Sequence, residues 1–135
     1  MKTLRYLLII GTISLGLYSF DQILQEEWKI PDKYIKMKNP TYVDKDNVEL
    51  GKALFSKHCK CCHGNTGKGD GPKSYEFSYN IVDFSTKDFQ EQPEGVIFYK
   101  SYNGLHEKPN FKKKISDETH MWFILNYLKT LAEES

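Results

Sequence analysis

The feature that most limits what this chain can become is the run Cys59-Lys-Cys61-Cys62-His63, which holds all three of its cysteines. Cysteines so close together cannot tie distant parts of a fold to one another, and neighbouring cysteines rarely pair, so a disulfide scaffold is excluded. Cys59 and Cys62 are three positions apart, which places them on one side of a single helical turn. Both sulfurs can then reach the two vinyl groups at one edge of a haem, and His63 can ligate the iron. This spacing predicts one covalently attached haem c.

Two other interpretations of the same residues stay open. Zinc could bind Cys59, Cys62 and His63, with Cys61 or His106 supplying the fourth ligand. A structural zinc site usually takes two separated ligand pairs, and here the second pair is missing. A thiol redox centre would be expected within a βαβ pattern, and no such pattern surrounds the cysteines. In the haem interpretation Cys61 is left over, and the sequence assigns it no role.

The N-terminus carries a second signal, because Lys2 and Arg5 precede a mostly apolar stretch over 6–20. This is the layout of a secretory signal, and the stretch is short for a full membrane span, which needs about twenty residues. We expect residues 1–20 to be a signal peptide or an N-terminal membrane anchor. The protein would then be periplasmic, or would face the periplasm from the inner membrane. The polar residues 21–46 are expected to form an extended arm with Trp28 as its packing anchor.

The remaining composition is that of one ordinary globular domain. The 135 residues include 27% charged and 39% hydrophobic side chains, with a formal net charge of +1. This excludes a polytopic membrane protein and a strongly basic nucleic-acid binder. Lysines gather near the cysteine motif and over 108–114, which either favours docking to an acidic partner or marks a solvated face.

Apolar periodicity predicts an all-α domain over residues 47–133. The first helix is expected over 47–58, with Asp46 or Asn47 as its N-cap and Gly51 on its apolar face. The last helix is expected to begin at Ser116, to end near 132 and to pack on the Gly51 face. The other expected elements are one helical turn at 32–37, a glycine-rich loop at 64–73, an irregular stretch at 74–91 and a helix from Pro93 to about Tyr102, with Gly104 as its stop.

Four motifs stand in order along the chain: Gly51-x-x-Leu54-Phe55, Cys59-x-x-Cys62-His63-Gly64, Gly67-x-Gly69-Asp70-Gly71-Pro72 and Trp122-x-x-x-x-Tyr127-Leu128-Lys129-x-Leu131. Together they resemble the class I, mitochondrial-type cytochrome c domain in its small bacterial mono-haem form. The resemblance covers about 47–131 and implies the cytochrome c fold, in which the first and last helices cross at Gly51 and Tyr127 around one haem. It also implies that the Pro72 carbonyl accepts the Nδ1–H of His63, which would orient the ring.

One position departs from this pattern, and it concerns the sixth iron ligand. The family's M-P-x-F loop reads Lys108-Pro-Asn-Phe111 here, so a lysine stands where the methionine is expected. His106 is favoured by its chemistry, because much imidazole is neutral at pH 7 whereas Lys108 must lose a proton at a cost of about 4–5 kcal/mol. Met37 and an open position are further alternatives, and Met121 is expected to pack in the core. A nitrogen ligand would lower the haem potential relative to methionine.

The resemblance implies a function in one-electron transfer between periplasmic or membrane redox partners, such as a membrane oxidoreductase complex, rather than an enzyme reaction. Cys59 and Cys62 would hold the haem, with His63 as proximal ligand. One alternative is a haem-based gas sensor or small haem enzyme with an open sixth position. Another is a fixed cytochrome subunit of a respiratory complex. The protein is expected to be a monomer or a complex subunit that binds no nucleic acid, with His58 and His120 at its surface.

Overall fold

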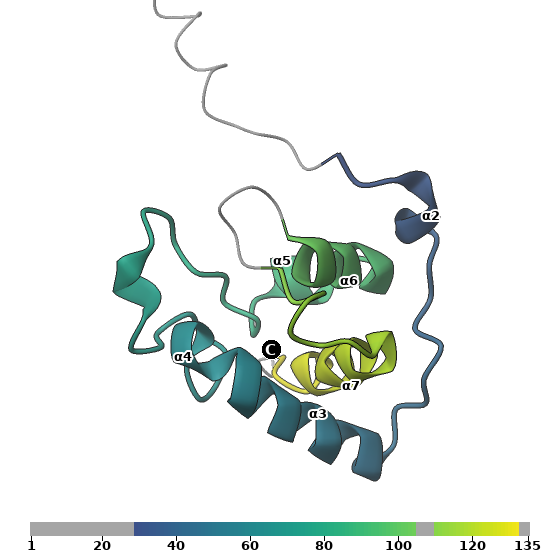
Figure 1. The fold of residues 1–135 in the computed structure, drawn as a ribbon, viewed down its shortest axis with the longest axis horizontal. Coiled ribbons are helices and arrows are strands. Elements are labelled where there is room, and N and C mark those ends of the chain that lie inside the picture. The colour runs from purple at the N-terminus through teal and green to yellow at the C-terminus, as the bar shows by residue number, and fades with distance from the viewer. Residues whose placement is uncertain (1–28, 105–109, 133–135) are drawn as a thin grey trace, which may run out of the picture.

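The computed structural model describes residues 29–104 and 110–132. The expected signal or anchor, the packing residue Trp28 and the ligand candidates His106 and Lys108 lie outside these ranges. Within them every regular element is a helix, as predicted (Figure 1). No helix in the described part of the chain is long and apolar enough to span a bilayer.

The two longest helices pack against each other at a buried glycine. They are α3 (Lys45–His58) and α7 (Glu118–Lys129), which lie side by side in Figure 1. A side chain at Gly51 would run into the backbone carbonyl of Phe123 and would come within 3.2 Å of the Cβ of Tyr127. One turn later the rings of Phe55 and Tyr127 meet with centroids 5.3 Å apart. The expected crossing at Gly51 and Tyr127 is confirmed.

The ends of these helices differ from the prediction because aspartates cap them. Asp44, rather than Asp46 or Asn47, is the N-cap of α3, and its Oδ1 accepts the backbone N–H of Asn47 at 2.8 Å. Asp117, rather than Ser116, caps α7 by accepting the N–H of Thr119 at 2.9 Å. Each carboxylate satisfies a helix N–H that has no partner within the helix.

A third helix, α6 (Glu94–Asn103), covers the side of α7 away from α3 (Figure 1). It follows Pro93 and stops at Gly104, whose φ of 69° lies in the left-handed region, as predicted. The rings of Phe98 and Trp122 stack between α6 and α7 with centroids 4.4 Å apart. The short helix α2 (Asp32–Ile35) packs on the outer side of α6.

The chain between α3 and α6 is mostly irregular, as predicted, and contains three short helices. These are α4 (Lys60–His63), the 3-10 helix at Ser74–Glu76 and α5 (Lys87–Gln90). The stretch around the 3-10 helix projects from the domain before the chain returns toward α5 (Figure 1). This excursion leaves space between α4 and α6 for the cavity described below.

A buried asparagine holds the segment before α3 against α7. The side chain of Asn126 is 1% exposed, and its Oδ1 accepts the Nδ2 of Asn39 at 2.6 Å. Its own Nδ2 donates to Thr41 Oγ1 and to the carbonyl of Tyr42, both at 3.1 Å. The polar atoms of this one residue therefore fix residues 39–42 across the helix.

Candidate functional site

The cysteine motif occupies the junction between α3 and α4. Cys59 ends α3 and its N–H still donates to the carbonyl of Phe55 at 2.8 Å, while its own carbonyl accepts the N–H of His63 at 3.0 Å. The motif therefore forms the helical turn that its spacing predicts, with Cys59 and Cys62 one turn apart. Because Phe55 and Cys59 are buried, the turn is rigidly attached to the core.

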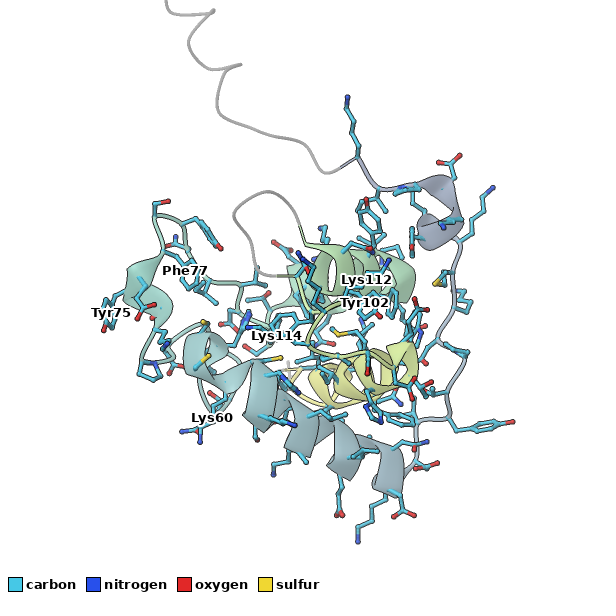
Figure 2. All side chains as sticks on the ribbon, in the orientation of Figure 1. Lys60, Tyr75, Phe77, Tyr102, Lys112 and Lys114 are labelled. Atoms are coloured by element: carbon cyan, nitrogen blue, oxygen red, sulfur yellow. The ribbon has the colours of Figure 1, made fainter. Side chains whose placement is uncertain are left out.

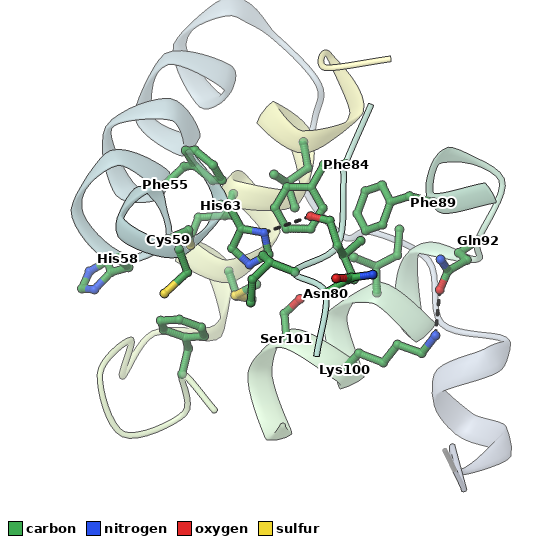
Figure 3. Close-up of a pocket in the computed structure, with 18 of the residues that line it drawn as sticks. Phe55, His58, Cys59, His63, Asn80, Phe84, Phe89, Gln92, Lys100 and Ser101 are labelled. Atoms are coloured by element: carbon green, nitrogen blue, oxygen red, sulfur yellow. Dashed lines mark hydrogen bonds between the residues drawn. The ribbon is translucent and has the colours of Figure 1, made fainter. Parts of the chain in front are cut away.

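Beside this turn lies a cavity of about 250 Å³ that Cys59, Cys62 and His63 all line (Figure 3). Its other walls are mainly apolar and come from α3, α5, α6, α7, the segment between α4 and α5 and the segment before α7. The apolar lining consists of Phe55, Phe77, Ile81, Val82, Phe84, Phe89, Ile97, Phe111, Met121, Ile124 and Leu128. Such walls suit a large flat apolar group whose fixed end lies at the cysteines.

Cys61 is set apart from the other two cysteines. It is exposed and does not line the cavity, although its Sγ lies 3.7 Å from that of Cys62. Cys59, by contrast, is buried, and this burial raises the pKa of its thiol to about 12, with smaller contributions from Cys61 and Cys62. The cavity therefore offers one sulfur pair to a ligand and leaves Cys61 facing solvent.

His63 is held by two contacts from the returning chain. Its Nδ1 lies 3.2 Å from the carbonyl oxygen of Val82, and its ring stacks on that of Phe84 with centroids 4.2 Å apart and 20° between the planes. Burial lowers the pKa of His63, and the Val82 carbonyl partly opposes this. The ring is therefore neutral at pH 7, with Nδ1 as donor and Nε2 left to bind a metal.

In the structure the carbonyl within hydrogen-bond distance of His63 Nδ1 is that of Val82. The sequence resemblance pointed to Pro72, an exposed residue, and its role in the haem-loaded protein stays a prediction. The loop around Pro72 turns its N–H groups toward the cysteine helix, since Gly71 donates to the carbonyl of Cys62 at 3.1 Å and Lys73 to that of Cys61 at 2.8 Å. The loop supports the turn from outside, and no sequence pattern marked the backbone of Val82.

Phe84 is a second site residue that sequence analysis left unassigned. Its N–H donates to the carbonyl of Gly67 at 2.8 Å, and its carbonyl accepts the Nε2 of Gln90 at 2.7 Å. The same Nε2 lies 2.9 Å from the carbonyl of Leu128 in α7. The stretch that carries both His63 contacts is thus fastened to the glycine-rich loop and to α7.

Only some of the candidates for the sixth iron ligand lie within the described residues. His106 and Lys108 lie outside the described residues and stay predictions. Met37 packs against Gly95 of α6 and does not line the cavity. Met121 is 2% exposed in the core, as predicted, and borders the cavity.

The two remaining histidines differ in their surroundings. His58 is half-buried rather than fully at the surface and meets the ring of Phe111 edge-on, with centroids 6.5 Å apart. Figure 3 shows its ring pointing away from the cavity, although the residue contributes to the lining. His120 is also half-buried and lies beside Phe123.

These donors fit a c-type haem better than a metal ion alone. Two thiols one turn apart, a neutral imidazole with an oriented Nδ1 and an apolar cavity match a macrocycle with two vinyl groups and a central iron. Among the described residues, no three His, Cys, Asp or Glu side chains come together as a ligand set for a bare ion. Bound haem would supply a reversible ferric–ferrous couple, and this chain would hold it and exclude water.

Comparison with known proteins agrees with the class that the fold and site define. The family described as Cytochrome c matches residues 48–132, and the chain belongs to this family. Its members bind haem c covalently and transfer electrons. The predicted recognition of a cytochrome c domain is therefore confirmed.

Similar proteins come from two kinds of comparison. The chain is 30% and 28% identical to the cbb3-type cytochrome c oxidase subunit CcoP of two Helicobacter pylori strains, over 67% and 71% of its own length. It spans only 29–30% of the length of those relatives. A Kuenenia stuttgartiensis chain from a reducing HAO-like protein complex superposes with a TM-score of 0.61 over 83% of this chain and 53% of that one. At 24% identity this likeness shows the fold alone.

Proposed function

We propose that this protein is a one-electron carrier with a single haem c bound through Cys59 and Cys62 and ligated by His63. The observation that carries the proposal is the meeting of both sulfurs and a neutral, oriented imidazole at one apolar cavity. The haem performs the redox chemistry, while the chain sets its potential and access. We place it between periplasmic or membrane-bound redox partners and treat it as a carrier rather than an enzyme.

The sixth ligand is proposed to be a nitrogen atom, from His106 in first place and from Lys108 as competitor. One of the described residues supports this indirectly, because the alternative ligand Met37 lies off the cavity. Nitrogen donates more strongly to ferric iron than a thioether does, so the potential would lie below that of a His/Met cytochrome. The protein would then serve a low-potential partner.

A second candidate function is that of a fixed cytochrome subunit in a respiratory complex. The names of the CcoP relatives favour it, since those proteins are subunits of an oxidase. Association that persists through detergent purification would distinguish a subunit from a free carrier.

We also propose that residues 1–20 direct export or anchor the chain, which the N-terminal sequence of the mature protein and cell fractionation would test.

The proposed carrier function is tested on protein matured in a host that attaches haem c. A pyridine haemochrome spectrum should show the c-type α band, and a redox titration should follow a one-electron curve. Low-temperature EPR and near-infrared spectra of the ferric protein should show His/His or His/Lys ligation. Protein without haem would contradict the proposal. Reduced protein that binds carbon monoxide without displacing a protein ligand would instead indicate a gas sensor or small haem enzyme.

A further inference from the structure

A haem bound in this cavity brings two carboxylates as well as an iron, and the chain must accommodate them. The thioethers form at the vinyl-bearing edge of the porphyrin, and the two propionates are carried at the opposite edge. A carboxylate taken into an apolar cavity needs a cation or hydrogen-bond donors, because an unpaired buried charge is very costly. This inference rests on the proposed function and concerns which residue meets that need.

Polar groups line the cavity away from the cysteines, from α6, from the turn before it and from the segment between α4 and α5. Lys100 of α6 and Gln92 both line the cavity, and Figure 3 shows them on the side opposite Cys59. Phe89 and Ile97 line the cavity with them and are buried. Asn80 and Ser101 also line the cavity but are uncharged, so a carboxylate at this end would meet Lys100 as its one cationic side chain among the described residues.

Lys100 is held in place by an amide whose own orientation is fixed. Its Nζ donates to Oε1 of Gln92 at 2.8 Å, and Nε2 of Gln92 donates to the carbonyl of Asp88 at 3.2 Å. Because the Gln92 N–H group is directed to α5, its oxygen faces the lysine. Gln92 is uncharged, so its contact orients the ammonium group of Lys100. A glutamate at position 92 would instead add an opposing negative charge.

The distribution of basic residues narrows the choice of a partner for the propionates. Among the described residues that line the cavity, Lys100 is the only lysine or arginine. The single arginine of the whole chain is Arg5, in the N-terminal segment, so the domain cannot use the bidentate guanidinium contact that often binds carboxylates. We propose that Lys100, held in place by Gln92, binds a haem propionate. Through this contact it positions the propionate and raises the haem potential.

The physical reason for the change in potential is electrostatic. Reduction adds one negative charge to the iron centre, and a nearby cation favours the more negative state. Lys100 also cancels a propionate charge that would otherwise favour ferric iron. Replacing Lys100 by a neutral residue should therefore lower the midpoint potential, and arginine at the same place should retain it.

The test measures midpoint potentials of four haem-loaded proteins by optical titration: wild type, Lys100→Gln, Lys100→Arg and Lys113→Gln. Lys113 is exposed and lies off the cavity, so its variant loses the same charge at a place that should not matter. We expect a lower potential for Lys100→Gln alone. The propionate-bending band in resonance Raman spectra should shift in that variant and recover in Lys100→Arg.

A second variant tests the same proposal if Lys100→Gln does not incorporate haem. Gln92→Glu adds a carboxylate that competes for the ammonium group, and it should also lower the potential. A potential equal to that of Lys113→Gln in either variant that matures would overturn the role of Lys100 and leave the carrier function intact. Wild-type protein without covalent haem would overturn both.

Discussion

At the scale of single residues, the contacts of His63 explain how an imidazole is prepared for iron. The Val82 carbonyl selects the tautomer with a proton on Nδ1, and the Phe84 ring fixes the plane of the imidazole. Both contacts come from one short stretch that Gln90 and Gly67 fasten in place. The ligand therefore depends on a backbone position that sequence motifs do not mark.

Phe84 should matter more than Pro72 for ligation, contrary to what the sequence resemblance implies. Phe84→Ala removes a ring that is 8% exposed and stacked on His63, and we expect it to lower the free energy of unfolding by about 3–5 kcal/mol. The EPR signal of the ferric protein should also broaden as the imidazole gains freedom. Pro72→Ala, at an exposed site, serves as the control. Equal effects of the two substitutions would contradict the assignment.

Cys61 should be the one titratable thiol of the mature protein. In the proposed haem attachment, addition of the Cys59 and Cys62 S–H groups across the two vinyl groups would consume both thiols, whereas Cys61 is exposed and off the cavity. A thiol reagent should therefore label one group per haem, and Cys61→Ser should abolish the labelling without shifting the haemochrome α band. Cys62→Ser, the matched control, should shift that band toward a single-thioether haem. Two labelled thiols per haem in wild type would show that one attachment is missing.

At the scale of helices, the structure rests on a backbone contact between α3 and α7 that only glycine allows. Gly51 is favoured by packing although it weakens the helix by about 1 kcal/mol relative to alanine. The loss is offset because the two helices approach closely and bury Phe55 against Tyr127. The cysteine turn lies at the end of α3, so this contact also places the residues proposed to bind haem.

Gly51→Ala should destabilise the protein despite its better helix propensity. The added methyl group meets the backbone carbonyl of Phe123, which cannot move aside as a flexible side chain could. We expect the free energy of unfolding, measured with denaturant, to fall by about 1–3 kcal/mol. Ala53→Gly, at an exposed position of the same helix, should cost about 1 kcal/mol from propensity alone. A Gly51→Ala variant more stable than wild type would rule out the close contact.

The elements that local chemistry controls could be predicted, and the site details that depend on folding could not. The cysteine spacing predicted the turn at 59–63, and the apolar stripes predicted the contact at Gly51. Helix starts were misplaced because Asp44 and Asp117 compete with equally good neighbouring caps. The roles of Val82 and Gln92 were missed because a carbonyl or an amide gains meaning only from what the chain brings next to it.

At the scale of the whole molecule, Asn126 joins the segment before α3 to the domain. Because its side chain is buried with every polar atom bonded, removing it leaves the Nδ2 group of Asn39 without its acceptor and takes from the carbonyl of Tyr42 one of two donors, the other being Asn47 Nδ2 at 3.0 Å. These bonds decide how the preceding chain leaves the domain.

Asn126→Ala should lower the free energy of unfolding by about 1–3 kcal/mol. It should also make the stretch around residues 39–43 more sensitive to protease, while the haem spectrum stays unchanged because Asn126 does not line the cavity. Asn65→Ala, at an exposed loop position, is the control. Wild-type protease resistance in Asn126→Ala would show that other contacts hold the segment.

The surface near the cavity should steer anionic redox partners even though the chain is nearly neutral. Burial lowers the pKa of His58, and the charges of Lys57 and Lys114 lower it further, so two lysines from distant segments meet beside a cavity-lining residue. Figure 2 shows Lys60 pointing outward from the cysteine turn. A local positive field raises encounter rates with anions and weakens beyond a Debye length of about 8–10 Å.

Oxidation of the ferrous protein by ferricyanide tests this field, because the oxidant is a small anion that needs no specific docking contact. The second-order rate constant should fall as ionic strength rises, and it should drop several-fold in the Lys57→Glu/Lys114→Glu variant at low salt. The control is Lys33→Glu/Lys45→Glu, which makes the same charge change at exposed positions that do not line the cavity. If both double variants slow the reaction equally, net charge rather than a local patch governs the encounter. A loss confined to Lys57→Glu/Lys114→Glu would place the route of electron transfer on the His58 side of the cavity.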